Sequence, residues 1–180
     1  MNYYLLVPSI LLFILLIILY RTKGFRRIDR EVKGFFIGRR MELKTKVYIV
    51  ITSLVAVSMI ALPIILFIIK DYHKLKVIII TLIIANIVGN LIKIVLKRER
   101  PLEKLVKETD YSFPSMHTFN GTIVYGLGIM LLGPIYSLLF IPLIILTGIS
   151  RMYLGVHYFT DVIGGLAFGL LTLSIIGVFL

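Results

Sequence analysis

The chain has 180 residues, 59% of them hydrophobic, and its mean hydropathy of +1.01 excludes a water-soluble globule. Its formal net charge of +11 indicates anionic lipid and the bilayer as partners, and we expect no nucleic acid. Cysteine is absent, which excludes disulfides and thiolate chemistry, and the length leads us to expect a single membrane-embedded domain over residues 1–180.

Six apolar runs approach the length that spans about 30 Å of hydrocarbon. They cover residues 3–20, 47–69, 77–96, 118–132, 135–149 and 162–180. The fourth and fifth runs are short for a span, so we expect their ends to lie several residues further out. The first run lacks a basic leader and a small-residue cleavage site, which favours a retained helix over a signal peptide. The expected fold is therefore all-α, a polytopic membrane protein with a bundle of six transmembrane helices.

The segment between the first two runs is strongly basic, because ten of the twenty Lys and Arg residues lie between Arg21 and Lys46. Its apolar residues recur at helical spacing: Phe25, Ile28, Val32 and Phe35. We expect an amphipathic helix in the headgroup region, with its cations offered to anionic lipid. The alternative is a solvated basic loop that only sets the topology.

The third apolar run carries polar residues along one face of the predicted helix. They are Asn86, Asn90, Lys93, Lys97 and Arg100. A lysine in hydrocarbon costs at least about 2.5–3.5 kcal/mol, so Lys93 is expected to face a cavity or a partner. Two helical turns separate Lys93 from Arg100, so both can converge on one anion before Pro101 ends the helix. For Lys97 and Arg98 we expect no more than side chains that reach water from the helix end.

A polar linker over residues 103–112 leads to Pro114-Ser115-Met116-His117, which opens the fourth run. Proline and serine suit a helix start, where free backbone N–H groups and the helix dipole attract phosphate. The Ser115 hydroxyl is expected to add a further hydrogen bond to such an anion.

A third polar segment contains Ser150-Arg151, His157 and Asp161. Asp161 follows His157 by four residues, so the two side chains meet on a continuing helical turn. A carboxylate bonded to one ring nitrogen fixes the tautomer and leaves the other nitrogen free to attack. Two histidines could instead bind a metal ion, but no third His or Cys accompanies them, which disfavours a zinc site.

In order, these segments read Lys93-x6-Arg100-Pro101, then Pro114-Ser115-Met116-His117, then Ser150-Arg151-x5-His157-x3-Asp161. This trio resembles the signature of the type 2 phosphatidic acid phosphatase superfamily, over roughly residues 93–161. The resemblance implies that His157 attacks phosphorus and forms a phosphohistidine, while His117 serves as the general acid and then the general base.

The resemblance also implies how the phosphate is held. Its expected ligands are Lys93, Arg100, Arg151, Ser115 and the backbone N–H of Met116. No cofactor and no metal are implied, since fixed cations take the place of magnesium. The family commonly has glycine before the histidine, and we expect the Met116 side chain to narrow the mouth or to shape an apolar entrance for a lipid chain.

By resemblance, the substrate is the phosphate of a phospholipid, an isoprenoid lipid or lipid A. The candidates are undecaprenyl diphosphate, phosphatidylglycerol phosphate, phosphatidate and lipid A 1-phosphate. Two alternatives stay open: a lipid phosphotransferase that passes the phosphoryl group to an acceptor hydroxyl, and a non-catalytic anion-binding membrane protein.

We expect a multi-pass protein of the bacterial inner membrane, but two arguments about its orientation conflict. With six spans, seventeen Lys and Arg share the face that carries the three segments, and the opposite face holds Lys70, Lys74 and Lys76. The charge bias places the site in the cytoplasm. Family resemblance places it on the extracytoplasmic side, so the orientation stays open.

Overall fold

The computed structural model describes residues 3–20 and 22–180, and all regular secondary structure in these two ranges is helical. This confirms the prediction of an all-α fold. The helices are α1 (Tyr3–Leu19), α2 (Lys23–Ile37), α3 (Glu42–Ile68), α4 (Tyr72–Leu96), α5 (Met116–Leu132), the 3-10 turn η1 (Pro134–Tyr136), α6 (Ser137–Tyr153) and α7 (Phe159–Phe179).

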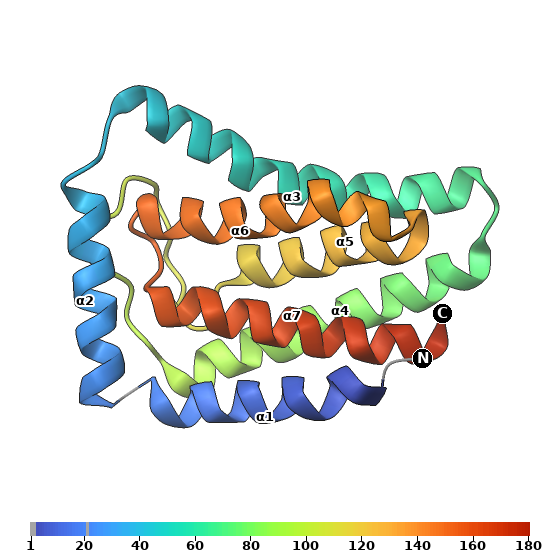
Figure 1. The fold of residues 1–180 in the computed structure, drawn as a ribbon, viewed down its shortest axis with the longest axis horizontal. Coiled ribbons are helices and arrows are strands. Elements are labelled where there is room, and N and C mark those ends of the chain that lie inside the picture. Colours follow the sequence, from blue (N-terminus) through green and yellow to red (C-terminus); the bar gives the residue numbers. More distant parts are fainter. Residues whose placement is uncertain (1–2, 21) are drawn as a thin grey trace.

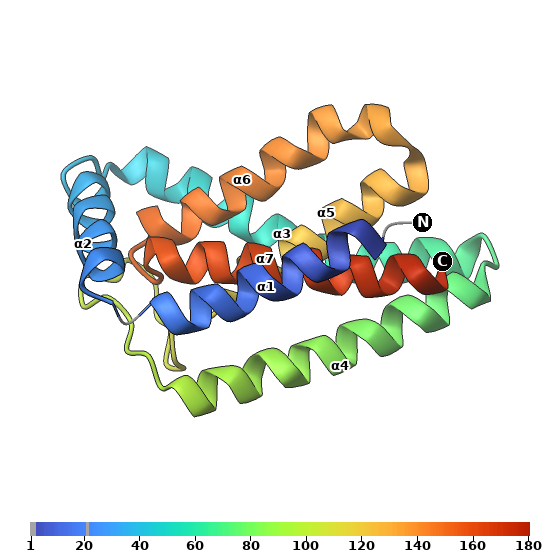
Figure 2. The same ribbon diagram turned by 60° about the horizontal axis from the view of Figure 1, so that its bottom comes forward.

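Helix α7 lies at the centre of the bundle and packs most extensively against α5 and α1 (Figures 1 and 2). Gly165 and Gly169 permit the close approach to α5, because a Cβ at Gly165 would collide with the carbonyl oxygen of Ser115 just before α5 and one at Gly169 with Thr122 of α5. The aromatic ring of Phe168 stacks between Phe119 and Phe13, with centroid distances of 4.5 and 5.0 Å. This packing fixes α5 and α7 relative to each other. Both helices begin at the end of the bundle that carries the polar segments.

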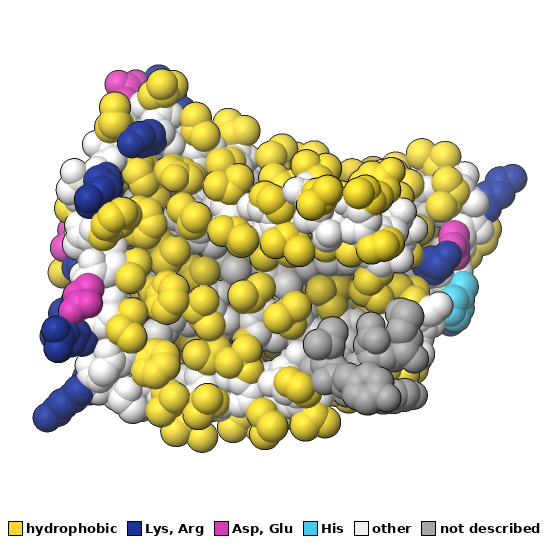
Figure 3. All heavy atoms as spheres, in the orientation of Figure 1, with side chains coloured by type: hydrophobic (Ala, Val, Ile, Leu, Met, Phe, Trp, Pro, Cys, Tyr) yellow, Lys and Arg dark blue, Asp and Glu magenta, His cyan; other side chains and the backbone are white. Residues whose placement is uncertain are grey.

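The sides of the bundle suit a lipid environment. Figure 3 shows hydrophobic side chains covering the flank, with charged side chains gathered at the two ends. Four helices of the described chain are long and apolar enough to cross a membrane, namely α3, α4, α7 and α6 together with η1. The bent pair α1–α2 would add a fifth, and α5 is a shorter apolar helix. The predicted count of six spans is therefore supported only roughly.

Helix α2 is the amphipathic helix expected in the basic segment, and it meets α1 at an angle of 89°. It lies across one end of the bundle, where it contacts α6 and α7 (Figure 1). Ile28 and Phe35 are exposed on α2, whereas Phe25 packs against the core. A helix in this position lies parallel to the membrane surface when the bundle spans the bilayer.

The helix ends depart from the sequence prediction in one place that matters for the site. Helices α5 and α6 extend further than their apolar runs, to Met116 and Tyr153, as expected. Helix α4, however, ends at Leu96, so the prediction that it continues to Pro101 is wrong. Lys97 adopts a left-handed backbone conformation with φ 48° and closes the helix. Arg98 and Arg100 therefore project from the linker and not from a helix face.

Candidate active site

The three predicted segments meet at the end of the bundle that α2 crosses. The end of α4, the α4–α5 linker, the start of α5 and the turn between α6 and α7 all lie there (Figure 1). His117 is the second residue of α5 and His157 lies in the α6–α7 turn, so both imidazoles belong to this end. Within residues 3–20 and 22–180, no three His, Asp or Glu side chains are arranged to hold a metal ion.

Three buried cations from three different parts of the chain form what we call the cation cup. Its members are Lys93 of α4, Arg100 of the linker and Arg151 of α6, and the exposed fraction of each side chain is at most 5%. The convergence predicted for Lys93 and Arg100 is present, although it arises from the linker and not from two turns of one helix. Buried charges of one sign need anionic partners.

In this structure the partners are two carboxylates of the linker, Glu108 and Asp110. Asp110 accepts hydrogen bonds from Lys93 Nζ and Arg100 Nη2, both at 2.5 Å. Glu108 Oε1 lies 2.5 Å from Arg151 Nη2, and its other oxygen lies 3.8 Å from Arg100 Nη2. A phosphate group in the cup would have to replace these carboxylates. Sequence reasoning missed them, although acids in a short linker directly after the motif cations Lys93 and Arg100 were a usable signal.

Electrostatics keep the Asp110 carboxylate ionised. Partial burial raises its pKa, but the hydrogen bonds and charges of Lys93 and Arg100 outweigh this and lower the pKa to about 2. The cup is therefore neutralised in large part by the chain itself at ordinary pH.

His157 is buried at the wall of the cation cup, with its Nε2 atom 3.0 Å from Arg100 Nη1. A guanidinium can only donate, so Nε2 is the acceptor nitrogen and Nδ1 carries the proton. Burial lowers the pKa of His157 well below its usual value, and the charges of Arg100, Arg151 and Lys93 lower it further. The ring is thus a neutral imidazole whose basic nitrogen faces the cup.

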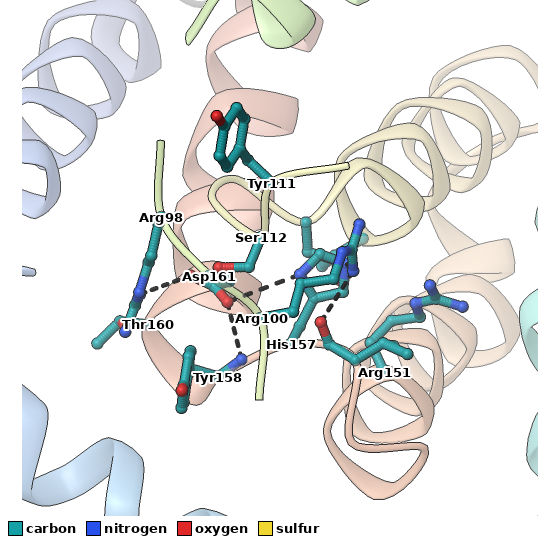
Figure 4. Close-up of polar contacts among 12 residues, drawn as sticks. Arg98, Arg100, Tyr111, Ser112, Arg151, His157, Tyr158, Thr160 and Asp161 are labelled. Atoms are coloured by element: carbon teal, nitrogen blue, oxygen red, sulfur yellow. Dashed lines mark hydrogen bonds and ion pairs between the residues drawn. The ribbon is translucent and has the colours of Figure 1, made fainter. Parts of the chain in front are cut away.

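Asp161 lies on the other side of the His157 ring, with its Oδ2 atom 3.6 Å from Nδ1. The two residues meet as predicted, but not on one helical turn, because His157 precedes α7 and Asp161 is in its first turn. The same Oδ2 accepts from the Tyr158 N–H at 2.8 Å (Figure 4). The Asp161 carbonyl accepts from the Ser115 N–H at 3.0 Å, which ties the start of α7 to the start of α5.

Arg98 also belongs to this site, and the prediction that it reaches water is wrong. Only 11% of its side chain is exposed, since the guanidinium lies between the carboxylates of Asp161 and of Asp29 in α2. Figure 4 shows Arg98 beside Asp161. Sequence reasoning also missed Asp29. Its position, four residues after Phe25 and three before Val32, puts an acid on the apolar stripe of α2, and this was the available signal.

The start of α5 provides backbone donors. In the described chain the N–H groups of Met116, His117 and Thr118 have no hydrogen-bond partner, as is usual in a first helical turn. Ser115 is buried before this turn, and its hydroxyl oxygen accepts from Thr118 Oγ1 at 3.0 Å. The Met116 side chain is half-buried and packs against the core beside Gly89 of α4, and the expectation that it shapes the mouth stays a prediction.

Comparisons with known proteins agree with this picture. The family model described as PAP2 superfamily matches residues 74–179, which include all the motif residues. Phosphatidylglycerophosphatase B of Bacillus subtilis (strain 168) is 36% identical over 97 residues. That match covers 48% of each sequence, so the chain spans about half the length of this curated relative.

Two solved structures have the same fold. The PAP2 type phosphatidylglycerolphosphate phosphatase from Bacillus subtilis matches with a TM-score of 0.87 and 26% identity, over 98% of this chain and 96% of that one. LpxE from Aquifex aeolicus matches with a TM-score of 0.70 and 21% identity, over 82% of this chain and 93% of that one, which shows the fold alone.

Proposed function

We propose that this chain, which belongs to the PAP2 superfamily, is an integral membrane lipid phosphatase that works through a phosphohistidine on His157. The observation that carries the proposal is the position of His157 Nε2, 3.0 Å from Arg100 Nη1 at the wall of the cation cup. An unprotonated nitrogen beside three fixed cations is the arrangement that nucleophilic attack on a phosphoryl group requires.

In the first step the substrate phosphate displaces Glu108 and Asp110 from the cation cup. Its non-bridging oxygens then contact Lys93, Arg100 and Arg151, with the N–H groups at the start of α5 and the Ser115 hydroxyl as further donors. The Nε2 lone pair of His157 forms the P–N bond as the bond between phosphorus and the leaving oxygen breaks. Burial and the charge of Arg151 lower the pKa of His117 to about 4 in this structure, so the negative charge of the bound phosphate must first favour its protonated form. His117 then donates this proton to the leaving oxygen.

In the second step a water molecule attacks the phosphohistidine. His117, now neutral, takes a proton from this water as the new P–O bond forms and the P–N bond breaks, which releases inorganic phosphate. The fixed cations stabilise charge on the oxygens in both transition states, so the proposed reaction needs no metal ion.

Asp161 supports both steps through the His157 ring. As the reaction proceeds, its carboxylate accepts a hydrogen bond from Nδ1–H without taking the proton. This contact keeps the lone pair on Nε2 and stabilises the positive charge that the ring acquires on phosphorylation. The present separation of 3.6 Å shortens to a hydrogen bond when that charge develops.

The substrate class follows from where the cation cup lies. The cup is at one end of an apolar bundle, so a lipid can present its phosphate there while its tails remain in the bilayer. The name of the curated relative supports phosphatidylglycerol phosphate as the first substrate to test. Undecaprenyl diphosphate, phosphatidate and lipid A 1-phosphate are the other members of the panel.

The test is release of phosphate from this panel by the purified protein in liposomes, with and without an acceptor alcohol. His157→Ala should abolish release. His73→Ala is the matched control, because His73 is exposed and contacts Phe179 at the end of α7. Release that persists in His157→Ala would refute the proposal, and transfer only to the acceptor would establish the phosphotransferase instead.

A further inference from the structure

One guanidinium connects the interfacial helix to the carboxylate beside the nucleophile. Arg98 Nη1 donates to Asp161 Oδ1 at 2.5 Å (Figure 4). Arg98 Nη2 donates to Asp29 Oδ2, also at 2.5 Å. Thr160 completes the network: its N–H and hydroxyl donate to the two Asp29 oxygens at 3.0 and 2.8 Å, and its hydroxyl accepts from Arg98 Nη1 at 2.6 Å. Residues from α2, the linker and α7 thus form one closed set of contacts.

The network is buried and carries two negative charges for one positive charge. The exposed fraction of the side chain is 3% for Asp29 and 0% for Asp161. Two carboxylates so close together are both tolerated as ions only while Arg98 lies between them. Loss of Arg98 would therefore leave Asp29 and Asp161 repelling each other across the space that the guanidinium now fills.

Arg98 also determines which way the Asp161 carboxylate faces. It holds Oδ1, and the Tyr158 N–H holds Oδ2, which is the oxygen nearest to His157 Nδ1. The terminal torsion of an aspartate is intrinsically broad. Without Arg98 the carboxylate keeps the Tyr158 N–H and the Ser112 hydroxyl as donors but loses its cationic partner on Oδ1, so it can rotate away from the imidazole. The aromatic ring of Tyr158, with its centroid 4.5 Å from the guanidinium carbon, further fixes the Arg98 side chain.

We infer that Arg98 and Asp29 are positioning residues for the nucleophile: Asp29 fixes Arg98, and Arg98 fixes Asp161 against His157. The inference rests on the proposed function, and it adds two residues outside the three motifs to the machinery of the reaction. It also makes α2, the helix that faces the membrane surface, part of the active site. Neither residue touches the phosphate, so their loss should change kcat and leave KM nearly unaltered.

The test compares Arg98→Met, Arg98→Lys, Asp29→Asn and the double variant Arg98→Met/Asp29→Asn in phosphate release from the best lipid of the panel. We expect Arg98→Met to lower kcat by about 10–100-fold, by analogy with the residues that orient metal-bound histidines, whose loss has effects of this size. Arg98→Lys should lie between Arg98→Met and wild type. The double variant should be faster than Arg98→Met, because removal of the Asp29 charge relieves the repulsion on Asp161.

A chemical rescue separates positioning from a merely structural role. Guanidinium ion, added below the concentrations that unfold the protein, should restore part of kcat in Arg98→Met. It should leave the control Arg27→Met unchanged, since Arg27 is an exposed residue of α2 that pairs with Glu31 outside this network. If Arg98→Met does not fold, the test uses Arg98→Lys and Asp29→Asn. Each of these variants should show a lower kcat with a nearly unaltered KM.

The outcomes for the two proposals are distinct. Wild-type protein that releases no phosphate from any lipid of the panel would refute the proposed function. An active wild type with wild-type kcat in the folded Arg98 and Asp29 variants would overturn the positioning role alone. A lower kcat with no rescue by guanidinium and no recovery in the double variant would also overturn it.

Discussion

Replacing Glu108 by glutamine should tighten the binding of phosphate to the cation cup. Glutamine keeps the size of the side chain and removes the charge that now lies 2.5 Å from Arg151 Nη2. Exposed ion pairs contribute about 0.2–1 kcal/mol and close pairs at desolvated interfaces about 1.5–7 kcal/mol. The side chain of Glu108 is 25% exposed and that of Arg151 is 2% exposed, so the pair lies between these two classes. We therefore expect the ion pair between Glu108 and Arg151 to contribute about 1.5 kcal/mol.

This free energy corresponds to roughly tenfold tighter binding of an anion that competes with Glu108. The free protein should also lose stability, because Arg151 is then buried without its partner. Vanadate should therefore inhibit Glu108→Gln at about one tenth of the concentration needed for wild type, and it should raise the melting temperature of the variant more than that of wild type.

The assay is inhibition of lipid phosphate hydrolysis by vanadate, together with thermal unfolding with and without vanadate. Glu103→Gln is the matched control, since Glu103 lies in the same linker but pairs with Lys33 outside the cation cup. Its inhibition constant should equal that of wild type. An inhibition constant in Glu108→Gln that is unchanged or weaker would refute the conclusion that Glu108 occupies the place of the phosphate.

Four further predictions concern the chemistry of the site. Asp161→Asn should fold normally and form the phosphoenzyme about 10²–10⁴-fold more slowly in a single-turnover assay, and a near-normal rate would contradict the orienting role. Because the pKa of His157 is lowered, its ring should stay neutral at pH 6 in NMR spectra of histidine-labelled protein, whereas titration near pH 6.5 would contradict the burial argument. Since the pKa of Asp110 is lowered from 3.8 to about 2, the stability from its contacts with Lys93 and Arg100 should persist above pH 4 and disappear as the pH falls toward 2; thermal unfolding that loses this stability near pH 6 would contradict the assignment. Activity should survive EDTA, and loss that a divalent ion restores would refute the metal-free reaction.

The sequence was sufficient for the features that depend on local pattern. Apolar runs of near-span length predicted the membrane helices, and the spacing of Phe25 and Val32 predicted α2. The motif residues Lys93, Arg151 and His157 come together because the ends of α4 and α6 and the turn before α7 share one end of the bundle. Helix ends were less predictable, since Leu96 ends α4 through the backbone conformation of Lys97 and not through Pro101.

The features that sequence reasoning missed depend on contacts between distant segments. Arg98 looks like an ordinary cation at a helix end until α2 places Asp29 beside it, 69 residues earlier in the chain. Glu108 and Asp110 look like solvated linker acids until the linker folds back over the cation cup. In each case the partner charge is supplied by tertiary packing, which periodicity and spacing do not encode.

The most direct test of the account is to identify the residue that carries phosphate during turnover. Wild-type protein would be mixed with the best lipid phosphate, quenched at alkaline pH where phosphohistidine survives, digested and sequenced by mass spectrometry. We expect phosphate on His157 in wild-type protein and no phosphorylated histidine peptide in His157→Ala. Phosphate on His117, or steady turnover through a phosphoenzyme that involves neither histidine, would contradict it.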